Sequence, residues 1–172
     1  EMGSNLFTVA DDVKAQINFN TENVKSFRLI GYENSKMSTT DFNDDKKDAG
    51  EIGMGTDVIV LIELELSELC NDGNLFDVCI RYKTPDKGES KELNLSASEI
   101  NTGETSSDFN FACAVAGFCE HLRESEFKGE MTVEGLITLA TENKGKDEKG
   151  YRAQFIEMLG QYKKIADMQQ AQ

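Results

Sequence analysis

The stretch LFDVCIRYK, residues 75–83, decides the predicted fold. Apolar side chains occupy every second position, at Phe76, Val78, Ile80 and Tyr82. Polar or small side chains fill the positions between them. A period of two residues is typical of a β-strand that turns one face toward a core and the other toward solvent. We therefore expect a half-buried strand here, and the same pattern can be sought on either side.

Two segments nearer the start of the chain have strand character. Residues 13–19 alternate in the same way, with Val13, Ala15, Ile17 and Phe19 on one side. The polar run at 20–23 is typical of a turn. Residues 24–33 follow as a second strand, and we expect it to be the other arm of a hairpin.

Strands also flank residues 75–83. Residues 57–66 are predicted to pair with them across a tight Asp72-Gly73 turn. A turn that holds Pro85 then leads to a returning strand at 89–96. Up to about residue 98 the pattern therefore predicts an antiparallel, sandwich-like meander.

The hydrophobic period changes after this point. Residues 106–108 are Ser-Ser-Asp, which favours a helix start, and nearly every residue of 109–119 is apolar or small. A helix that is apolar all round is a buried helix, so we expect it to pack against the sheet. Thr132 is placed to cap a second helix. A third helix carries the apolar stripe Tyr151, Phe155, Met158, Leu159 and Tyr162.

Strands first and helices afterwards predict an α+β fold with about three C-terminal helices. We assign residues 13–98 to the β portion, which includes a long acidic loop at 34–56. Residues 99–172 form the helical portion, packed on the sheet. Residues 1–12 are expected to be a linker that begins with a cloning remnant, Met2-Gly3-Ser4. The sequence is therefore expected to be a piece of a longer protein.

The charge balance restricts the possible partners. The 172 residues include 18 Lys and Arg against 32 Asp and Glu, a formal net charge of −14. Nucleic acids and anionic lipid surfaces bind cationic surfaces, so neither is an expected partner. No apolar run approaches the roughly 20 residues of a membrane-spanning helix.

The four cysteines, Cys70, Cys79, Cys113 and Cys119, form no CxxC pair, and the chain has one histidine. A zinc site is therefore not expected. Six residues along one helix separate Cys113 from Cys119 by about 9 Å, and the predicted turn register places Cys70 and Cys79 about 13 Å apart. Both distances exceed the reach of a disulfide. We expect four free thiols, mostly buried.

Catalytic motifs are missing from the sequence. His121, the single histidine, points away from Cys119 if both lie on one helix, so the two cannot form a nucleophile–base pair. There is no GxxxxGK[ST] loop, and the glycine-rich segment 50–55 carries an acidic residue where a phosphate would bind. We therefore predict no catalytic residues, no cofactor and no enzymatic activity.

The loop DFNDDKKDAGE, residues 41–51, is the one segment in which a metal has to be weighed. Asp41, Asn43 and Asp45 have the spacing of the first three ligands of a calcium loop. However, Lys46 stands where that loop needs glycine, and Ile52 stands where it needs glutamate. We expect a structural loop ordered by Asp and Asn side chains, with weak calcium binding as the alternative.

Six segments of this chain resemble one bacterial family. They are FRLIGYEN at 27–34, DFNDDK at 41–46, DAGEIG at 48–53, VCIRYK at 78–83, SDFNFA at 107–112 and GYRAQF at 150–155. Together they resemble the C-terminal region of von Willebrand factor type A domain proteins of the YfbK type. The motif positions that carry the resemblance are Arg28, Gly31, Tyr32, Asn34, Asp44, Asp45, Gly50, Gly53, Tyr151 and Arg152.

This resemblance implies a region of uncharacterised function that follows a von Willebrand A domain. Such a domain binds a divalent metal through a DxSxS motif, and no DxSxS occurs in this sequence. The implied role is a non-enzymatic accessory or protein-interaction module. Its expected partners are the A domain of the same chain and proteins of the cell envelope, where the protein would be a periplasmic or surface lipoprotein. A calcium-stabilised adhesion module and a carboxylate-dependent hydrolase are the alternatives.

Overall fold

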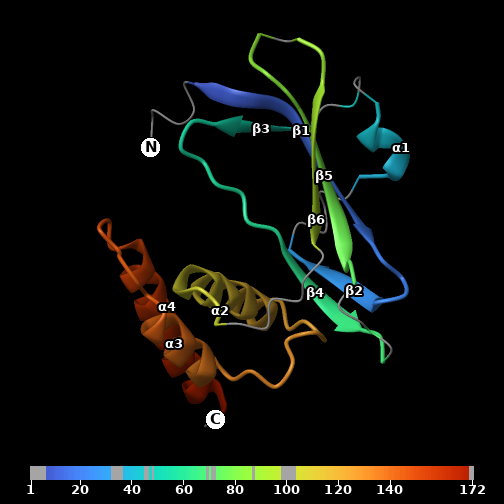
Figure 1. Ribbon diagram of the computed structural model, residues 1–172. Helices are drawn as coiled ribbons and strands as arrows, with labels where there is room; N and C mark the ends of the chain where they lie inside the picture. Colours follow the sequence, from blue (N-terminus) through green and yellow to red (C-terminus); the bar gives the residue numbers. More distant parts are fainter. Residues whose placement is uncertain are drawn as a thin grey trace. The chain divides into compact units, whose positions relative to one another are not determined.

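The computed structural model describes residues 7–31, 37–44, 47, 49–68, 70, 73–86, 88–97 and 104–170 (Figure 1). The chain divides into two compact units, residues 1–101 and 102–172. The first unit carries the strands and the second carries the long helices, which confirms the α+β class. We describe each unit by itself.

The first unit contains two antiparallel sheets. Its elements are β1 (Thr8–Phe19), β2 (Val24–Ile30), α1 (Thr39–Phe42), β3 (Gly50–Gly53), β4 (Leu61–Leu66), β5 (Phe76–Lys83) and β6 (Lys91–Ala97). One sheet has the strand order β3-β1-β5-β6, and the other pairs β2 with β4 (Figure 1).

The alternation of β5 sets the apolar face of the four-stranded sheet. Ile17 of β1 lies opposite Val78, and Leu95 of β6 lies opposite Val78 on the other side. At the end of this face, the Phe19 ring stacks on Phe27 of β2 at 4.0 Å between centroids. The two sheets therefore contact each other through these two rings.

The predicted hairpin between residues 13–19 and 24–33 is wrong. The turn between β1 and β2 is a corner between the two sheets, and β2 pairs with β4. Asn20 and Asn23 each donate a side-chain hydrogen bond to the carbonyl of Asn74, at 2.9 and 3.1 Å. These bonds hold the corner against the start of β5, so the chain leaves one sheet and enters the other.

The predicted pairing of residues 57–66 with 75–83 is also wrong. β5 lies between β1 and β6 instead. The predicted strand at 57–66 is also shorter than expected: it corresponds to β4, which begins at Leu61, the partner of Ile30. After Ile30 the chain turns at Gly31, whose φ of 75° suits glycine, so β2 offers no further partner. Residues 58–60 consequently lie outside any ladder.

Residues 1–12 are not all linker, and residues 34–56 are not all loop. Thr8 to Asp12 form the first part of β1, where Thr8 pairs with Gly53 and Ala10 with Ile52. The expected loop thus supplies β3, as well as the short helix α1. An edge strand of four residues is too short to show a period in the sequence, which is why the pattern did not reveal it.

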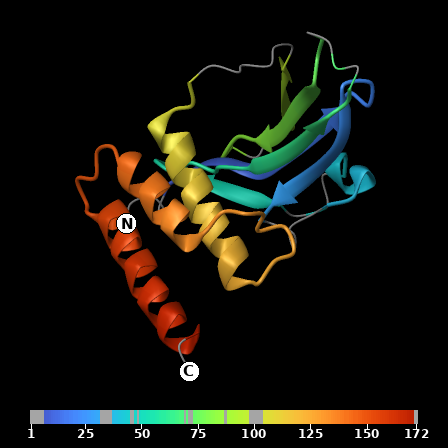
Figure 2. The ribbon, with the colours of Figure 1, turned by 90° about the horizontal axis from the view of Figure 1, so that it is seen from below.

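The second unit consists of α2 (Ser107–Leu122), α3 (Val133–Glu142) and α4 (Tyr151–Gln170). The predicted caps are confirmed, because the Ser106 hydroxyl accepts from Phe109 N and the Thr132 hydroxyl from Gly135 N, both at 3.1 Å. α3 and α4 run side by side in opposite directions (Figure 2), joined by a 2.9 Å ion pair between Glu134 and Lys163. Within the described residues, no helix has the length and apolar character to cross a membrane.

The core of the helical unit uses one face of each helix. Its buried members are Phe111, Ala114, Phe118, Leu136, Ala140 and Leu159. Phe118 makes edge contacts with Phe155 and Tyr162 at 6.0 and 5.2 Å between ring centroids. Close approach of α2 and α3 requires Gly117, where an added Cβ would lie 2.7 Å from the Leu136 side chain.

Two expectations about these helices need correction. α2 is not buried all round, because Phe109 is 48% exposed and Cys119 is exposed as well. On α4, Phe155, Leu159 and Tyr162 belong to the core, whereas Tyr151 and Met158 are exposed. A single helix face suffices to cover a three-helix core, so the remaining apolar positions stay on the outside. The packing of the helices on the sheet stays a prediction.

Candidate functional site

The most deeply buried charged group of the described residues lies on the polar face of the four-stranded sheet. Lys14 of β1 has a side chain that is 1% exposed, and its Nζ lies 3.1 Å from Asp12 Oδ1. The other carboxylate oxygen of Asp12 lies 2.9 Å from Lys83 Nζ of β5. One carboxylate thus joins two ammonium groups from neighbouring strands.

An irregularity in β1 brings these three side chains together. The pairing of β1 with β5 shifts register between Asp11 and Lys14, and Asp12 has a left-handed φ of 51°. A β-bulge of this kind redirects a side chain out of the regular alternation. Asp12 therefore reaches Lys14 and Lys83.

The two lysines change the acidity of the Asp12 carboxyl. Burial by itself would raise the pKa of this group, but hydrogen bonds and charge attraction from Lys83 and Lys14 together lower its pKa below the ordinary value. The carboxylate is therefore ionised at neutral pH and lies between two ammonium groups. A group in this state can order structure, but it is a poor general base.

Lys14 also holds the acidic segment on the sheet. Its Nζ donates to the carbonyl of Asp44 at 2.8 Å. Arg81 of β5 donates to the Asn43 carbonyl and to Asn43 Oδ1 at 3.4 and 3.5 Å. Two cations thus bind the carbonyl groups that follow α1, while Phe42 beside them is 6% exposed.

The calcium candidates are committed to other contacts. Asp41 Oδ1 lies 3.7 Å from Lys47 Nζ, and Asn43 Oδ1 accepts from Arg81. Asp45 lies outside the described residues. In the part of the chain that the structure describes, no group of three or more His, Cys, Asp or Glu is arranged to hold a metal ion.

The motif positions of the first unit have structural roles where they are described. Arg28 of β2 pairs with Glu63 of β4, with its Nη2 2.8 Å from Oε2. Gly31 forms the turn that ends β2, and Asp44 accepts from Lys14. Gly50 and Gly53 are the ends of β3, where they pair with Val13 and Thr8. Tyr32, Asn34 and Asp45 lie outside the described residues.

The motif positions of the helical unit tie α4 to α2. Arg152 Nη2 donates to Asp108 Oδ1 at 2.6 Å, and Nη1 donates to the Lys144 carbonyl at 2.9 Å. The guanidinium lies 4.8 Å from the centroid of the Phe111 ring. Tyr151, its neighbour in the motif, is 54% exposed. The SDF and GYR segments therefore meet in space, which explains why both belong to one signature.

A missed residue, Asp147, completes this junction. Its carboxylate oxygens accept from the backbone N–H groups of Arg152 and Ala153 at 3.2 and 2.8 Å. Despite partial desolvation, these bonds and nearby cations lower the pKa of Asp147. Asp147 thus caps the start of α4. An aspartate just before a helical pattern is a usable signal for such a cap.

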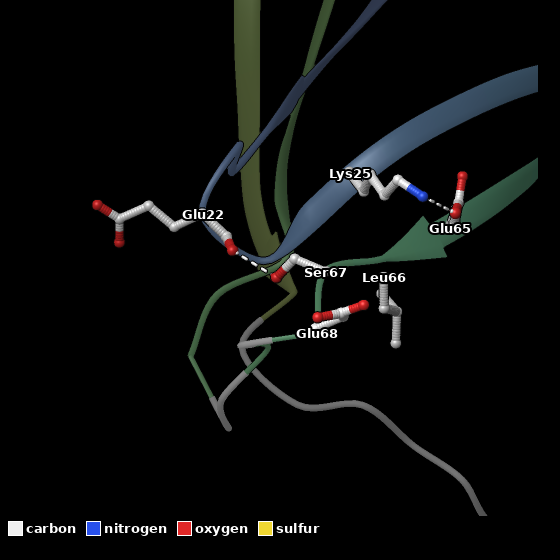
Figure 3. Close-up of a pocket in the computed structure, with 6 residues that line it drawn as sticks. All are labelled: Glu22, Lys25, Glu65, Leu66, Ser67 and Glu68. Carbon is white, nitrogen blue, oxygen red and sulfur yellow. Dashed lines mark hydrogen bonds and ion pairs between the residues drawn. The ribbon is translucent and has the colours of Figure 1, made fainter.

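A shallow pocket of about 410 Å³ lies at the end of the β2–β4 sheet (Figure 3). It is lined by Glu22, Lys25, Glu65, Leu66, Ser67 and Glu68. Figure 3 shows that Lys25 pairs with Glu65 and that the Ser67 hydroxyl donates to the Glu22 carbonyl, at 2.6 Å. The hydroxyl in this pocket therefore already serves a structural bond.

The cysteines and the histidine also have structural surroundings. None of the four cysteines forms a disulfide, as expected, but the expectation that most are buried is wrong, because Cys119 is exposed and the other three are half-buried. Burial raises the pKa of the Cys113 thiol, and burial together with Glu92 raises that of Cys79, despite the opposing effect of Arg81. A raised pKa disfavours the reactive thiolate. His121 Nε2 donates to the Met131 carbonyl and so ties the end of α2 to the following loop.

The sequence pattern missed the Asp12, Lys14 and Lys83 cluster. Lys14 stands at an outward position of an alternating strand, which is typical of a solvated lysine. It is buried because α1 lies over it, and α1 is too short to have been expected. The run Asp11-Asp12 beside Lys14 was the available signal.

The charged groups of both units make structural contacts between neighbouring elements. The family model for the C-terminal region of the uncharacterized protein YfbK matches residues 4–72 and 65–165 of this chain. The chain belongs to this family.

One curated relative is the uncharacterized protein YfbK of Escherichia coli strain K12, which is 34% identical over 192 aligned positions. The match includes 99% of this chain and 32% of the relative, so the chain spans about a third of that protein's length. No solved structure matches.

Proposed function

We propose that this chain is a non-enzymatic accessory and protein-interaction module that follows a von Willebrand A domain in a bacterial cell-envelope protein. Membership of the YfbK C-terminal family supports a role at the end of a larger protein, because about two thirds of the relative lies outside the matched part. The full-length protein would be a periplasmic or surface lipoprotein.

The observation that carries the proposal is the apolar run at residues 58–60. Val58, Ile59 and Val60 are consecutive, lie outside any described ladder, and are 56%, 59% and 47% exposed. Single exposed apolar residues are ordinary, but a contiguous group indicates a protein contact. These β-branched residues directly precede β4, so a partner that packs on them would also extend the ordered part of that strand.

The charged groups of the first unit support a binding role rather than catalysis. Asp12 is held between two lysines, and Arg28 and Glu63 hold each other across β2 and β4. Such bonds fix the framework that presents residues 58–60. The A domain of the same polypeptide is the proposed partner, because its linkage to this chain supplies a high effective concentration even for a weak contact.

Calorimetric titration of the purified A domain of the native protein into this chain tests the proposal. We expect measurable binding that is lost when Val58, Ile59 and Val60 are all changed to serine. A matched control changes Leu122, Ile165 and Met168 to serine, because these are equally exposed on the helical unit (54%, 56% and 63%). The control should bind like the parent.

Two results would contradict the proposal. The first is no binding of the A domain by the parent chain at concentrations up to the millimolar range. The second is equal loss of binding in the serine variant and its control. Envelope placement is tested separately by fractionating cells that produce the full-length protein, which should appear with the envelope and not with the cytoplasm.

A further inference from the structure

The strand β6 forms an open edge of the four-stranded sheet. It pairs with β5 in seven regular steps, from Phe76 opposite Ala97 to Tyr82 opposite Lys91. Among the described residues, no strand pairs with its outer side. Such an edge presents alternate backbone N–H and C=O groups to any strand that approaches. The opposite edge, β3, is four residues long and pairs with register shifts, so it is a poor template.

The strand β6 has no proline, and its ladder with β5 has no bulge. Proteins block exposed edges with proline, bulges or charged side chains. The sequence of β6 is KELNLSA, and its charges, Lys91 and Glu92, occupy the first two positions. The middle carries Leu93 and Leu95, which are 49% and 54% exposed. Both lie on the apolar face, opposite Ile80 and Val78.

We propose that β6 pairs with β6 of a second copy of this chain, antiparallel, about a two-fold axis at Asn94. In this register Asn94 faces Asn94, and Leu93 of each copy faces Leu95 of the other. Glu92 of each copy faces Ser96, and Lys91 faces Ala97. The result is a continuous eight-stranded sheet with an uninterrupted apolar face. The interface is self-complementary and therefore closes as a dimer.

The charges of β6 select this register. The two-fold axis of an antiparallel pair of identical strands passes through a residue that faces its own copy. An axis at Lys91 or Glu92 would place like charges opposite each other, which is destabilising. An axis at Leu93 or Leu95 would pair five of the seven residues. The axis at Asn94 pairs all seven, brings no like charges together, and lets the two amide groups hydrogen-bond.

Sedimentation equilibrium over a range of concentrations tests the dimer. We expect the mass to rise from 19.1 kDa toward twice that value as the concentration increases. The double variant Leu93→Lys and Leu95→Lys should weaken association at least tenfold, because it places cations in the paired strands. Its control, Leu122→Lys with Ile165→Lys, alters equally exposed leucine and isoleucine side chains and should associate like the parent.

Far-ultraviolet circular dichroism shows whether each variant retains its fold. We expect that it does, because the altered side chains are exposed. A parent that is monomeric at every concentration would overturn the proposal. So would a dimer that resists the lysine pair on β6 or is equally weakened by the control pair.

Cross-linking tests the register in a background with Cys79→Ser and Cys119→Ser. Cys79 is removed because it lies opposite Asn94 within the β5–β6 ladder. In this background, Asn94→Cys should form a disulfide-linked dimer on mild oxidation. Glu92→Cys should not, because its two copies would stand four positions apart, about 13 Å, beyond disulfide reach. Equal cross-linking of the two variants, or none from Asn94→Cys, would refute the register. The outcome is independent of whether an A domain binds residues 58–60.

Discussion

Replacing Lys14 by methionine should destabilise the first unit more than any other lysine substitution we consider. The change keeps most of the side-chain volume and removes only the ammonium group. In the native structure this group is buried, lies 3.1 Å from Asp12 Oδ1 and donates to the Asp44 carbonyl at 2.8 Å. The variant therefore leaves Asp12 with one cation in place of two, and leaves the Asp44 carbonyl with the backbone N–H of Lys47, at 3.2 Å, as a donor.

The magnitude follows from these two losses. Loss of one hydrogen bond to a half-buried carbonyl that keeps another donor costs about 0.5–1.5 kcal/mol. Breaking a buried ion pair costs about 3–5 kcal/mol when the remaining charge has no partner, but Lys83 still lies 2.9 Å from Asp12. We therefore expect Lys14→Met to lower the free energy of unfolding by about 2–4 kcal/mol. Lys83→Met, at a position that is 23% exposed, should cost about 1 kcal/mol because Lys14 remains.

Urea unfolding followed by circular dichroism measures both variants, and hydrogen exchange locates the effect. Amides of residues 37–44 and 50–53 should exchange faster in Lys14→Met than in Lys83→Met, because Lys14 donates to the Asp44 carbonyl whereas Lys83 pairs with Asp12. A free energy of unfolding within 0.5 kcal/mol of the parent, or unchanged exchange in these residues, would refute the role of Lys14 as the anchor of this segment.

Four further predictions concern acid stability, the helical core, the helix junction and calcium. Folding lowers the pKa of Asp12, so its carboxylate stabilises the fold above its ordinary pKa of about 3.9 and loses this effect as the pH falls through the lower folded-state pKa. The stability of Asp12→Asn, followed in an acid titration, should lack this part of the pH dependence. A pH profile equal to that of the parent would contradict the prediction. In urea unfolding, Phe118→Ala should lower the free energy of unfolding by about 3–5 kcal/mol, whereas Phe109→Ala, at an exposed position, should lower it by less than about 1 kcal/mol. Equal losses would show that the Phe118 face of α2 is not buried. Arg152→Ala should lower the free energy of unfolding by about 1–3 kcal/mol. Arg152→Lys should restore only part of this loss, because a single ammonium group cannot replace the two guanidinium nitrogens that donate to Asp108 and to the Lys144 carbonyl. Full stability of the lysine variant would contradict this geometry. Millimolar calcium should shift the melting temperature by less than about one degree, because Asp41 pairs with Lys47 and Asn43 with Arg81; a rise of several degrees that a chelator reverses would overturn this.

The sequence predicted local structure better than strand pairing. The alternation of residues 75–83 indicates which side chains share one face of a strand, and this can be read from the sequence. The helix caps at Ser106 and Thr132 depend only on residues within three positions along the chain, so they could be predicted as well. Pairing depends on backbone groups that every residue shares. The turn at 20–23 therefore indicated a change of direction, but it could not show that the chain crosses to another sheet.

The candidate site was harder to predict than the fold. The acidic run at 41–51 drew attention to its carboxylates, yet the described hydrogen bonds to Lys14 and Arg81 use the carbonyl groups of Asn43 and Asp44 and the side-chain amide of Asn43. Backbone carbonyls leave no trace in a sequence. Arg152 and Asp108 could be linked to the family signature, although their contact required the folded helices. Lys14 was missed because burial by a four-residue helix has no periodic pattern.

The position of β1 has a consequence for the order in which this protein forms during synthesis. Among the described strands, β1 is made before the others, yet it lies inside the sheet, where Ile17 faces Val78 about sixty residues later in the chain. It must wait for β5 before its ladder can close, and such distant pairings slow folding. The helical unit, by contrast, joins segments that are close in sequence. The helical unit can therefore fold soon after it is made, whereas β1 depends on a nascent chain that stays soluble until β5 has been made.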